Sequence, residues 1–315
     1  CVQRPVAIRR VGLYIPGGTA PLFSTVLMLA LPAEIAGCGE IILCTPTDKQ
    51  GRVAAEVLYA ARRCGVTNVY KAGGAQAIAA MAYGTESVPK VDKIFGPGNR
   101  YVTMAKQMVA ARNTAIDMPA GPSEVMVLAD ASANPTFVAA DMLSQAEHGR
   151  DSQAIVVCDS VALAESVAAE VERQRVLLSR ADYVAESLAN SRAIVFDNRD
   201  DMIAFANEYA AEHLIVSMAD AWGVAAEITA AGSIFIGNYS PESAGDYASG
   251  TNHTLPTSGW AHSCSGVNID SFVRKITIQE LSKSGIEALA PTIIAMAEAE
   301  GLEAHAAAVK VRIEN

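Results

Sequence analysis

The sequence predicts an α/β protein with two parallel-sheet units followed by a helical tail. Strand-like and helix-like segments alternate along most of the chain, which is typical of parallel strands joined by crossover helices. Hydrophobic residues make up 51% of the 315 residues and aromatic residues only 6%, a balance that favours close packing of helices on sheets over a β-sandwich. A chain of this length can bury more than one core. We therefore expect two domains and an appendage.

The first unit is predicted over residues 14–122. In chain order we expect a helix from Pro21 onward, the strand EIILCTP, a helix over 52–64, a strand in VTNVYKAGG, an Ala-rich helix, a strand in VDKIFG, and a helix from about Asn99 to Arg112. The run IDMPAGPSE then marks a boundary, because Pro and Gly punctuate it. Residues 1–13 are interpreted as the remnant of an N-terminal region. The chain opens with Cys1, and we expect it to be a fragment that lacks its natural N-terminus.

The second unit is predicted over residues 123–265. We expect the strand EVMVLAD, a helix over 135–148, the strand QAIVVCD, a long helix over 159–178, the strand RAIVFD, another helix, the strand HLIVSM, a helix over 219–230, and the strand SIFIGNY. Residues 266–315 are expected to form the tail, helical from about Ile278 to Val311 and broken by Pro291 and Gly301. Such a tail packs on its own body or on a partner subunit.

Charge and cysteine content narrow the function classes. The formal net charge is −10, which disfavours nucleic-acid binding because phosphate contacts need patches of Lys or Arg. We expect a small-molecule partner instead. The six cysteines have no CxxC spacing, which indicates reduced thiols in a cytoplasm. The longest apolar stretch, PLFSTVLMLALPAEIAGC, is interrupted by Pro32 and Glu34, so no membrane span is predicted.

Two pairs of neighbouring polar residues are candidates for chemistry. Gln145 and His148 are three positions apart near the end of a predicted helix, where one face carries both. A histidine that interacts only with the helix dipole is the bland alternative. Glu212 and His213 lie at the entry to a predicted strand, and a carboxyl group beside an imidazole is suited to proton removal near neutral pH. Both serve one site only if the backbone there is irregular, because neighbouring strand residues point to opposite faces.

Two further segments carry candidate ligands. SPESAGDYASGTNH is a polar run that core packing does not require, and it contains Glu242, Asp246 and His253. Asp246 is expected to be an oxygen ligand, with a turn-forming role as the alternative. In EGLEAH, Glu300 and His305 are five apart, and Gly301 permits a break that brings them together. The alternative is a solvated histidine at a helix end.

Nucleotide binding is indicated only weakly by local pattern. No GxGxxG follows a strand, so an ordinary Rossmann phosphate loop is not predicted. Three other glycine turns, GLYIPGGTA, KAGGAQA and FGPGN, adjoin predicted strands or helices, where backbone amides can face an anion. Tyr14, Gln76 and Asn99 lie in or beside these turns.

Six strings together resemble the histidinol dehydrogenase family, and the resemblance covers essentially the whole chain. They are GLYIPGGTAPLFSTVLMLA, GGAQAIAAMAYGTESVPKVDKIFGPGN, IDMPAGPSEV, LSQAEHG, EHLI and SPESAGDYASGTNHTLPT. The resemblance implies two incomplete Rossmann-like domains, NAD as cofactor, one zinc ion per subunit, and a homodimer whose C-terminal segments are exchanged to build shared active sites. It implies an oxidation of L-histidinol through L-histidinal to L-histidine with two NAD, at the end of histidine biosynthesis.

The resemblance also implies roles for individual residues. It assigns zinc ligation to Gln145, His148, Asp246 and, from the other subunit, His305; acid-base catalysis to Glu212 and His213; substrate contacts to these six residues with Ser123 and Glu300; and cofactor contacts to Tyr14, Gln76 and Asn99. None of these residue types is missing.

One rival mechanism and two rival functions differ in what they require. A thiohemiacetal route needs a cysteine in the site, yet none adjoins the candidate residues in sequence. A zinc hydrolase needs no NAD. An inactive binding paralogue would have lost Glu212, His213 or a ligand.

Overall fold

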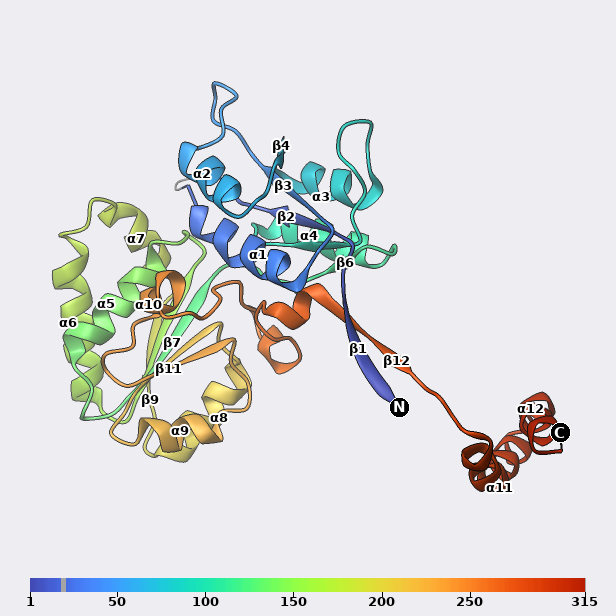
Figure 1. The fold of residues 1–315 in the computed structure, drawn as a ribbon. Helices are drawn as coiled ribbons and strands as arrows, with labels where there is room; N and C mark the ends of the chain where they lie inside the picture. The colour runs from blue at the N-terminus through green and yellow to red at the C-terminus, as the bar shows by residue number, and fades with distance from the viewer. Residues whose placement is uncertain (18–20, 315) are drawn as a thin grey trace. The chain divides into compact units, whose positions relative to one another are not determined.

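The computed structural model describes residues 1–17 and 21–314 and divides into two compact units (Figure 1). The larger unit, Ala7–Val273, contains two five-stranded sheets. The smaller unit joins Cys1–Val6 to the chain from Arg274 onward. This confirms the α/β class with two parallel sheets, while the finer boundaries at 122/123 and 265/266 stay predictions.

The first sheet has its earliest strand in the middle, in the order β4-β3-β2-β5-β6. Its strands are β2 Arg10–Tyr14, β3 Glu40–Thr45, β4 Asn68–Lys71, β5 Lys93–Phe95 and β6 Ala115–Ile116, and its helices are α1 Phe23–Ala36, α2 Ala55–Arg63, α3 Gly74–Tyr83 and α4 Arg100–Ala110. All pairs are parallel. Alternate strand residues enter two cores: Leu43 packs with α1 and α2, whereas Ile42 and Cys44 pack with α3 and α4. Helices therefore cover both faces.

The second sheet repeats this topology, in the order β11-β10-β7-β8-β9. Its strands are β7 Glu124–Ala129, β8 Gln153–Cys158, β9 Arg192–Val195, β10 His213–Ser217 and β11 Ser233–Ile236, and its helices are α5 Pro135–Ala146, α6 Val161–Arg175, α7 Ala181–Leu188, α8 Arg199–Tyr209, α9 Ala221–Glu227 and α10 Glu242–Tyr247. Val125 and Val127 pack with α5 and α6, while Met126 and Leu128 pack with α8 and α9. Both sheets thus have the Rossmann strand order 3-2-1-4-5, without the sixth strand.

The long helix expected over 159–178 is wrong in its extent. α6 ends at Arg175, and the separate helix α7, which the sequence analysis missed, buries Val184 and Ser187. The connecting segment VLLSR contains neither Gly nor Pro, so no local signal marked the end of α6.

The smaller unit also differs from expectation in part. It consists of β1 Val2–Ala7, which pairs with β12 Val273–Ile278, and of the helices α11 Lys283–Ala299 and α12 Glu303–Ile313. Neither strand was predicted. Pro291 does not break the tail but lies inside α11, on an exposed position where the carbonyl that loses its partner can reach water. The break at Gly301 is confirmed, with a φ of 72°.

A glycine fixes the end of β5 against β2. Gly96 has a φ of 119°, and a Cβ on it would lie 2.1 Å from the Tyr14 carbonyl oxygen. By contrast, Gly51 has a φ of 76° but open space around it.

We expect Gly96→Ala to lower the free energy of unfolding by more than about 2 kcal/mol, because strain and a backbone clash add together, and Gly51→Ala to lower it by about 1 kcal/mol. Urea denaturation followed by circular dichroism measures both. Equal losses in the two variants would show that the clash at Gly96 is relieved at no cost.

Candidate active site

A cavity of about 300 Å³ lies between the two sheets of the larger unit. The first sheet contributes the carboxyl ends of β2 and β5, with Tyr14 and the turn Pro97–Asn99. The second sheet contributes the amino ends of β7 and β10, with Ser123, Glu212 and His213. The start of α1, the turn after α5 and the helix α10 complete the wall. Neither Lys nor Arg is among the described lining residues.

Glu212 and His213 meet in this cavity because the backbone before β10 is irregular, as expected. Ala210 ends α8 in the left-handed conformation, with a φ of 53°. Glu212 then precedes the strand, and its Oε2 lies 3.6 Å from His213 Nδ1. The Glu124 N–H donates to Glu212 Oε2 at 3.0 Å, and the Glu124 carbonyl oxygen lies 3.4 Å from His213 Nδ1. One backbone residue of β7 thereby contacts both side chains.

The atoms around the imidazole of His213 indicate which ring nitrogen carries the proton. Nδ1 faces only oxygen atoms: the Glu124 carbonyl, the Glu212 carboxyl and, at 4.0 Å, Glu242 Oε2. We therefore place the proton on Nδ1. Nε2 is buried without a hydrogen-bond partner and lies 3.9 Å from Asp246 Oδ1. Burial, and to a smaller degree the charge of His148, lowers the pKa of His213 to about 3. His213 is thus a neutral base with a free Nε2.

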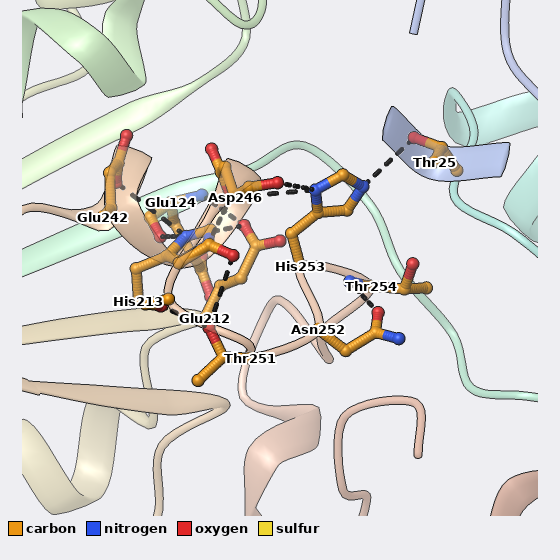
Figure 2. A network of polar contacts seen from close by, with 12 residues as sticks. Thr25, Glu124, Glu212, His213, Glu242, Asp246, Thr251, Asn252, His253 and Thr254 are labelled. Atoms are coloured by element: carbon orange, nitrogen blue, oxygen red, sulfur yellow. Dashed lines mark hydrogen bonds and ion pairs between the residues drawn. The ribbon is translucent and has the colours of Figure 1, made fainter. Parts of the chain in front are cut away.

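Carboxyl groups crowd the same place (Figure 2). Burial, reinforced by neighbouring carboxylates, raises the pKa of Glu212 and of Glu242 well above the ordinary range, and burial raises the pKa of Asp246 to about 6. Both oxygens of Glu242 are buried without a hydrogen bond; Ser144 lies near this carboxyl group but outside hydrogen-bond geometry. Because neither Lys nor Arg is among the described residues that line the cavity, this cluster favours protonation or the binding of a cation.

The residues expected to bind metal are partly brought together. His148 and Asp246 line the cavity. Gln145 is fully buried, and both its side-chain oxygen and its nitrogen lack a partner, which fits an amide that is completed by a ligand. The helix predicted over 135–148 ends at Ala146, and His148 follows in a turn, where its N–H donates to the Gln145 carbonyl oxygen at 3.1 Å. Over residues 1–17 and 21–314, no three His, Cys, Asp or Glu side chains form a metal cluster. Gln145 is not one of these residue types, so the larger unit supplies only two such members of the expected zinc set, His148 and Asp246.

The polar run after β11 is not a plain loop. It forms α10, which carries Glu242 and Asp246 into the buried site. Further along, His253 connects the two halves: its Nε2 lies 3.2 Å from Thr25 Oγ1 on α1, and its Nδ1 lies 3.2 Å from the Asp246 carbonyl oxygen. Glu242 and His253 lie in a run predicted to carry ligands but had no predicted role of their own, and Glu124 was not predicted. The concentration of ionisable residues in an otherwise hydrophobic unit was the available signal.

The expected cofactor residues lie on the first sheet. The Tyr14 hydroxyl accepts a hydrogen bond from the Gly74 N–H at 3.1 Å, and burial raises its pKa. The Asn99 side chain caps α4 by accepting from the amides of Tyr101 and Val102. Gln76 is exposed in the first turn of α3 and does not line this cavity. A second cavity of about 670 Å³ at the end of β3 shares Pro16 and Gly17 with it. In the turn GLYIPGGTA, residues 18–20 lie outside the described residues.

The remaining predictions concern the tail and the cysteines. Glu300 follows α11 and His305 lies in α12, both exposed in the smaller unit. The six cysteines are free, as expected, and none of them lines the cavity. In the described part of the chain, no helix is long and apolar enough to span a bilayer.

Comparison with known proteins gives a consistent result. The sequence model of the histidinol dehydrogenase family matches residues 1–313. Histidinol dehydrogenase from Bacteroides fragilis (strain YCH46) is 63% identical over 314 residues, covering 100% of this chain and 73% of the relative. The enzyme from Salmonella typhimurium is 56% identical and covers 99% and 71%.

Solved structures agree. The crystal structure of histidinol dehydrogenase from Elizabethkingia anophelis superposes with a TM-score of 0.97 at 54% identity, covering 99% of this chain and 72% of that one. An acetylating aldehyde dehydrogenase from Geobacillus thermoglucosidasius reaches a TM-score of 0.58 at 15% identity, covering 89% and 77%. At that identity, the likeness concerns the fold alone.

The carboxyl cluster predicts a pH-dependent stability in metal-free protein. Because the pKa of Glu242 is raised above its ordinary 4.5, the folded state binds the extra proton, and stability falls as pH rises above about 4.5 towards the folded pKa. Glu242→Gln removes this loss. We expect the variant to match the wild type near pH 4.5 and to be increasingly more stable at higher pH, measured by urea denaturation. The exposed Glu86→Gln is the control, and parallel pH curves for the Glu242 variant and the wild type would contradict the assignment.

Proposed function

The chain belongs to the histidinol dehydrogenase family, and we propose that it oxidises L-histidinol through L-histidinal to L-histidine, with two molecules of NAD and one zinc ion per subunit. The main support is the neutral His213 with a free Nε2, which lies beside Glu212 in a cavity between two Rossmann-like sheets. The proposal includes a cytoplasmic homodimer acting in histidine biosynthesis.

Zinc would be held by Gln145, His148 and Asp246, with His305 of the partner subunit completing the set. The donors fit the ion, because imidazole nitrogens and a carboxylate oxygen are ordinary zinc ligands and the amide of Gln145 adds a neutral oxygen donor. The unpartnered Gln145 amide and the crowded carboxyl groups support a cation here. Bound zinc would supply an anchor for the imidazole and amine nitrogens of the substrate.

NAD would supply the hydride acceptor, held by Tyr14, Gln76 and Asn99. The larger cavity adjoins the candidate site through Pro16 and Gly17 and has room for the part of a dinucleotide that lies away from the nicotinamide. It opens at the carboxyl ends of parallel strands, where such folds bind nucleotides.

In the first oxidation, His213 Nε2 would take the proton of the substrate hydroxyl as its carbon is oxidised to the aldehyde, and bound NAD would supply the hydride acceptor. The imidazolium formed in this step is stabilised by the oxygen atoms around Nδ1. Ser123 and Glu300 are assigned to substrate contacts, and their role is to hold the carbon towards the cofactor.

In the second oxidation, Glu212 would take a proton from the water that adds to the aldehyde carbon, while the His213 imidazolium returns its proton to the aldehyde oxygen, which gives the gem-diol. The neutral His213 would then remove a proton from one hydroxyl group as this carbon is oxidised, a second bound NAD supplying the hydride acceptor. The acid formed loses its remaining proton to solvent, and the product is the carboxylate. Burial raises the pKa of Glu212, which makes its carboxylate a stronger base than that of an exposed glutamate. A thiohemiacetal route has no support, since no cysteine lines the cavity.

We expect chelation to abolish histidinol oxidation and added zinc to restore it, because the substrate would lose its anchor. The assay follows reduced nicotinamide by its absorbance, with metal content measured on the same sample. Full activity in a sample verified to be free of metal would overturn the zinc assignment.

Replacing the two acid-base residues should separate the half-reactions. We expect His213→Asn to slow both oxidations by about 10²-fold or more, and Glu212→Gln to slow histidinal oxidation by a similar factor but histidinol oxidation much less, because only the former needs an activated water. Cys158→Ser and Cys264→Ser serve as controls that leave turnover intact. Equal losses of Glu212→Gln in both half-reactions would remove its assigned role.

A further inference from the structure

A buried ion pair lies beneath the cofactor side of the cavity, outside the site described above. Lys106 on α4 pairs with Asp117, which follows β6, and their side chains are 2% and 1% exposed. Neither residue lines a described cavity.

This pair binds both backbone polar groups of Gly96. Lys106 Nζ donates to the Gly96 carbonyl oxygen at 2.8 Å, and Asp117 Oδ2 accepts from the Gly96 N–H at 2.7 Å. The other carboxylate oxygen accepts from the Met118 N–H at 2.7 Å. Gly96 is the residue with the strained φ that opens the turn after β5.

An apolar pair would pack α4 against the sheet equally well, because burying two charges costs about as much as their attraction returns. It would not supply a donor and an acceptor to Gly96, whose peptide groups would then be buried without partners. The charged pair of Lys106 and Asp117 therefore holds the backbone of Gly96 in place through these two hydrogen bonds.

The turn from Gly96 to Asn99 forms part of the cavity wall. Pro97, Gly98 and Asn99 line the cavity, and the Asn99 side chain is held by the first amides of α4 at 3.1 and 3.2 Å. Because Gly96 begins this turn, a shift of Gly96 would move Asn99 relative to Tyr14, which lines the same cavity.

We propose that Lys106 and Asp117 are positioning residues for the cofactor: by fixing the turn from Gly96 to Asn99, they set the affinity for NAD without touching it. The inference rests on the proposed function in that the ligand of this turn is NAD.

The test is Lys106→Met in the full chain, which keeps length and burial but removes the ammonium group. We expect Kd for NADH and KM for NAD to rise about tenfold, because a small displacement of a positioning group weakens binding. The maximal rate at saturating NAD and KM for histidinol stay within about twofold. Amide hydrogen exchange at Gly96 should become faster.

Val109→Ala is the matched control, since Val109 is buried on the same helix at 4% exposure and its loss destabilises by leaving a cavity without touching Gly96. It should leave Kd for NADH and exchange at Gly96 unchanged. Asp117→Asn is the second variant: its amide oxygen still accepts from Gly96, so a smaller rise in Kd is expected, and it decides the question if Lys106→Met does not fold.

Wild-type affinity for NADH in the folded variants, with stability lowered as in Val109→Ala, would overturn the inference and leave the proposed function standing. A wild-type chain that neither binds NADH nor forms it from histidinol would overturn both.

Discussion

The side of the cavity that carries Glu212 and His213 depends on the backbone of one residue, Glu124, at the start of β7. In a parallel sheet, the N–H and C=O of one residue point to the same neighbouring strand. Those of Glu124 point towards β10, whose pairing with β7 begins one residue later, at His213 and Val125. Glu124 therefore lies at the start of this ladder and contacts the side chains of Glu212 and His213. Its own carboxyl group accepts from the Ser258 N–H and the Tyr209 hydroxyl, which ties this point to α8 and to the segment after α10.

The two sheets share one topology but use opposite edges. In the first sheet, the cavity lies at the carboxyl ends of β2 and β5, where the strand order reverses and nucleotides ordinarily bind. In the second sheet, it lies at the amino ends of β7 and β10. Residues that follow β2 and β5 thus face residues that precede or begin β7 and β10 across the cavity. The arrangement puts acid-base groups opposite the expected cofactor side, and His253 links the halves through Thr25 and Asp246.

Much of the architecture could be predicted from the sequence, because alternating strand and helix patterns are typical of parallel sheets with helices on both faces. Eight of the ten strands of the two sheets were placed this way, and β2 and β6 were not. The end of α6 and the helix α7 could not be predicted, because no Gly or Pro separates the two helices. The pairing of β1 with β12 could not be predicted either, because each strand is stabilised only by a partner that is distant in sequence. In the site, Glu212, His213 and Asp246 came from residue type and resemblance. Glu124 and Glu242 were missed because their role depends on which strand starts beside them and on a short helix inside a polar run, which are features of tertiary structure.

The most direct test of the central claim is the stoichiometry of the reaction. With zinc-loaded protein, excess NAD and a limiting amount of L-histidinol, the account predicts two molecules of reduced nicotinamide for each histidinol consumed, with histidine as the product. One reduced nicotinamide per histidinol with the aldehyde accumulating, or none at all, would contradict it.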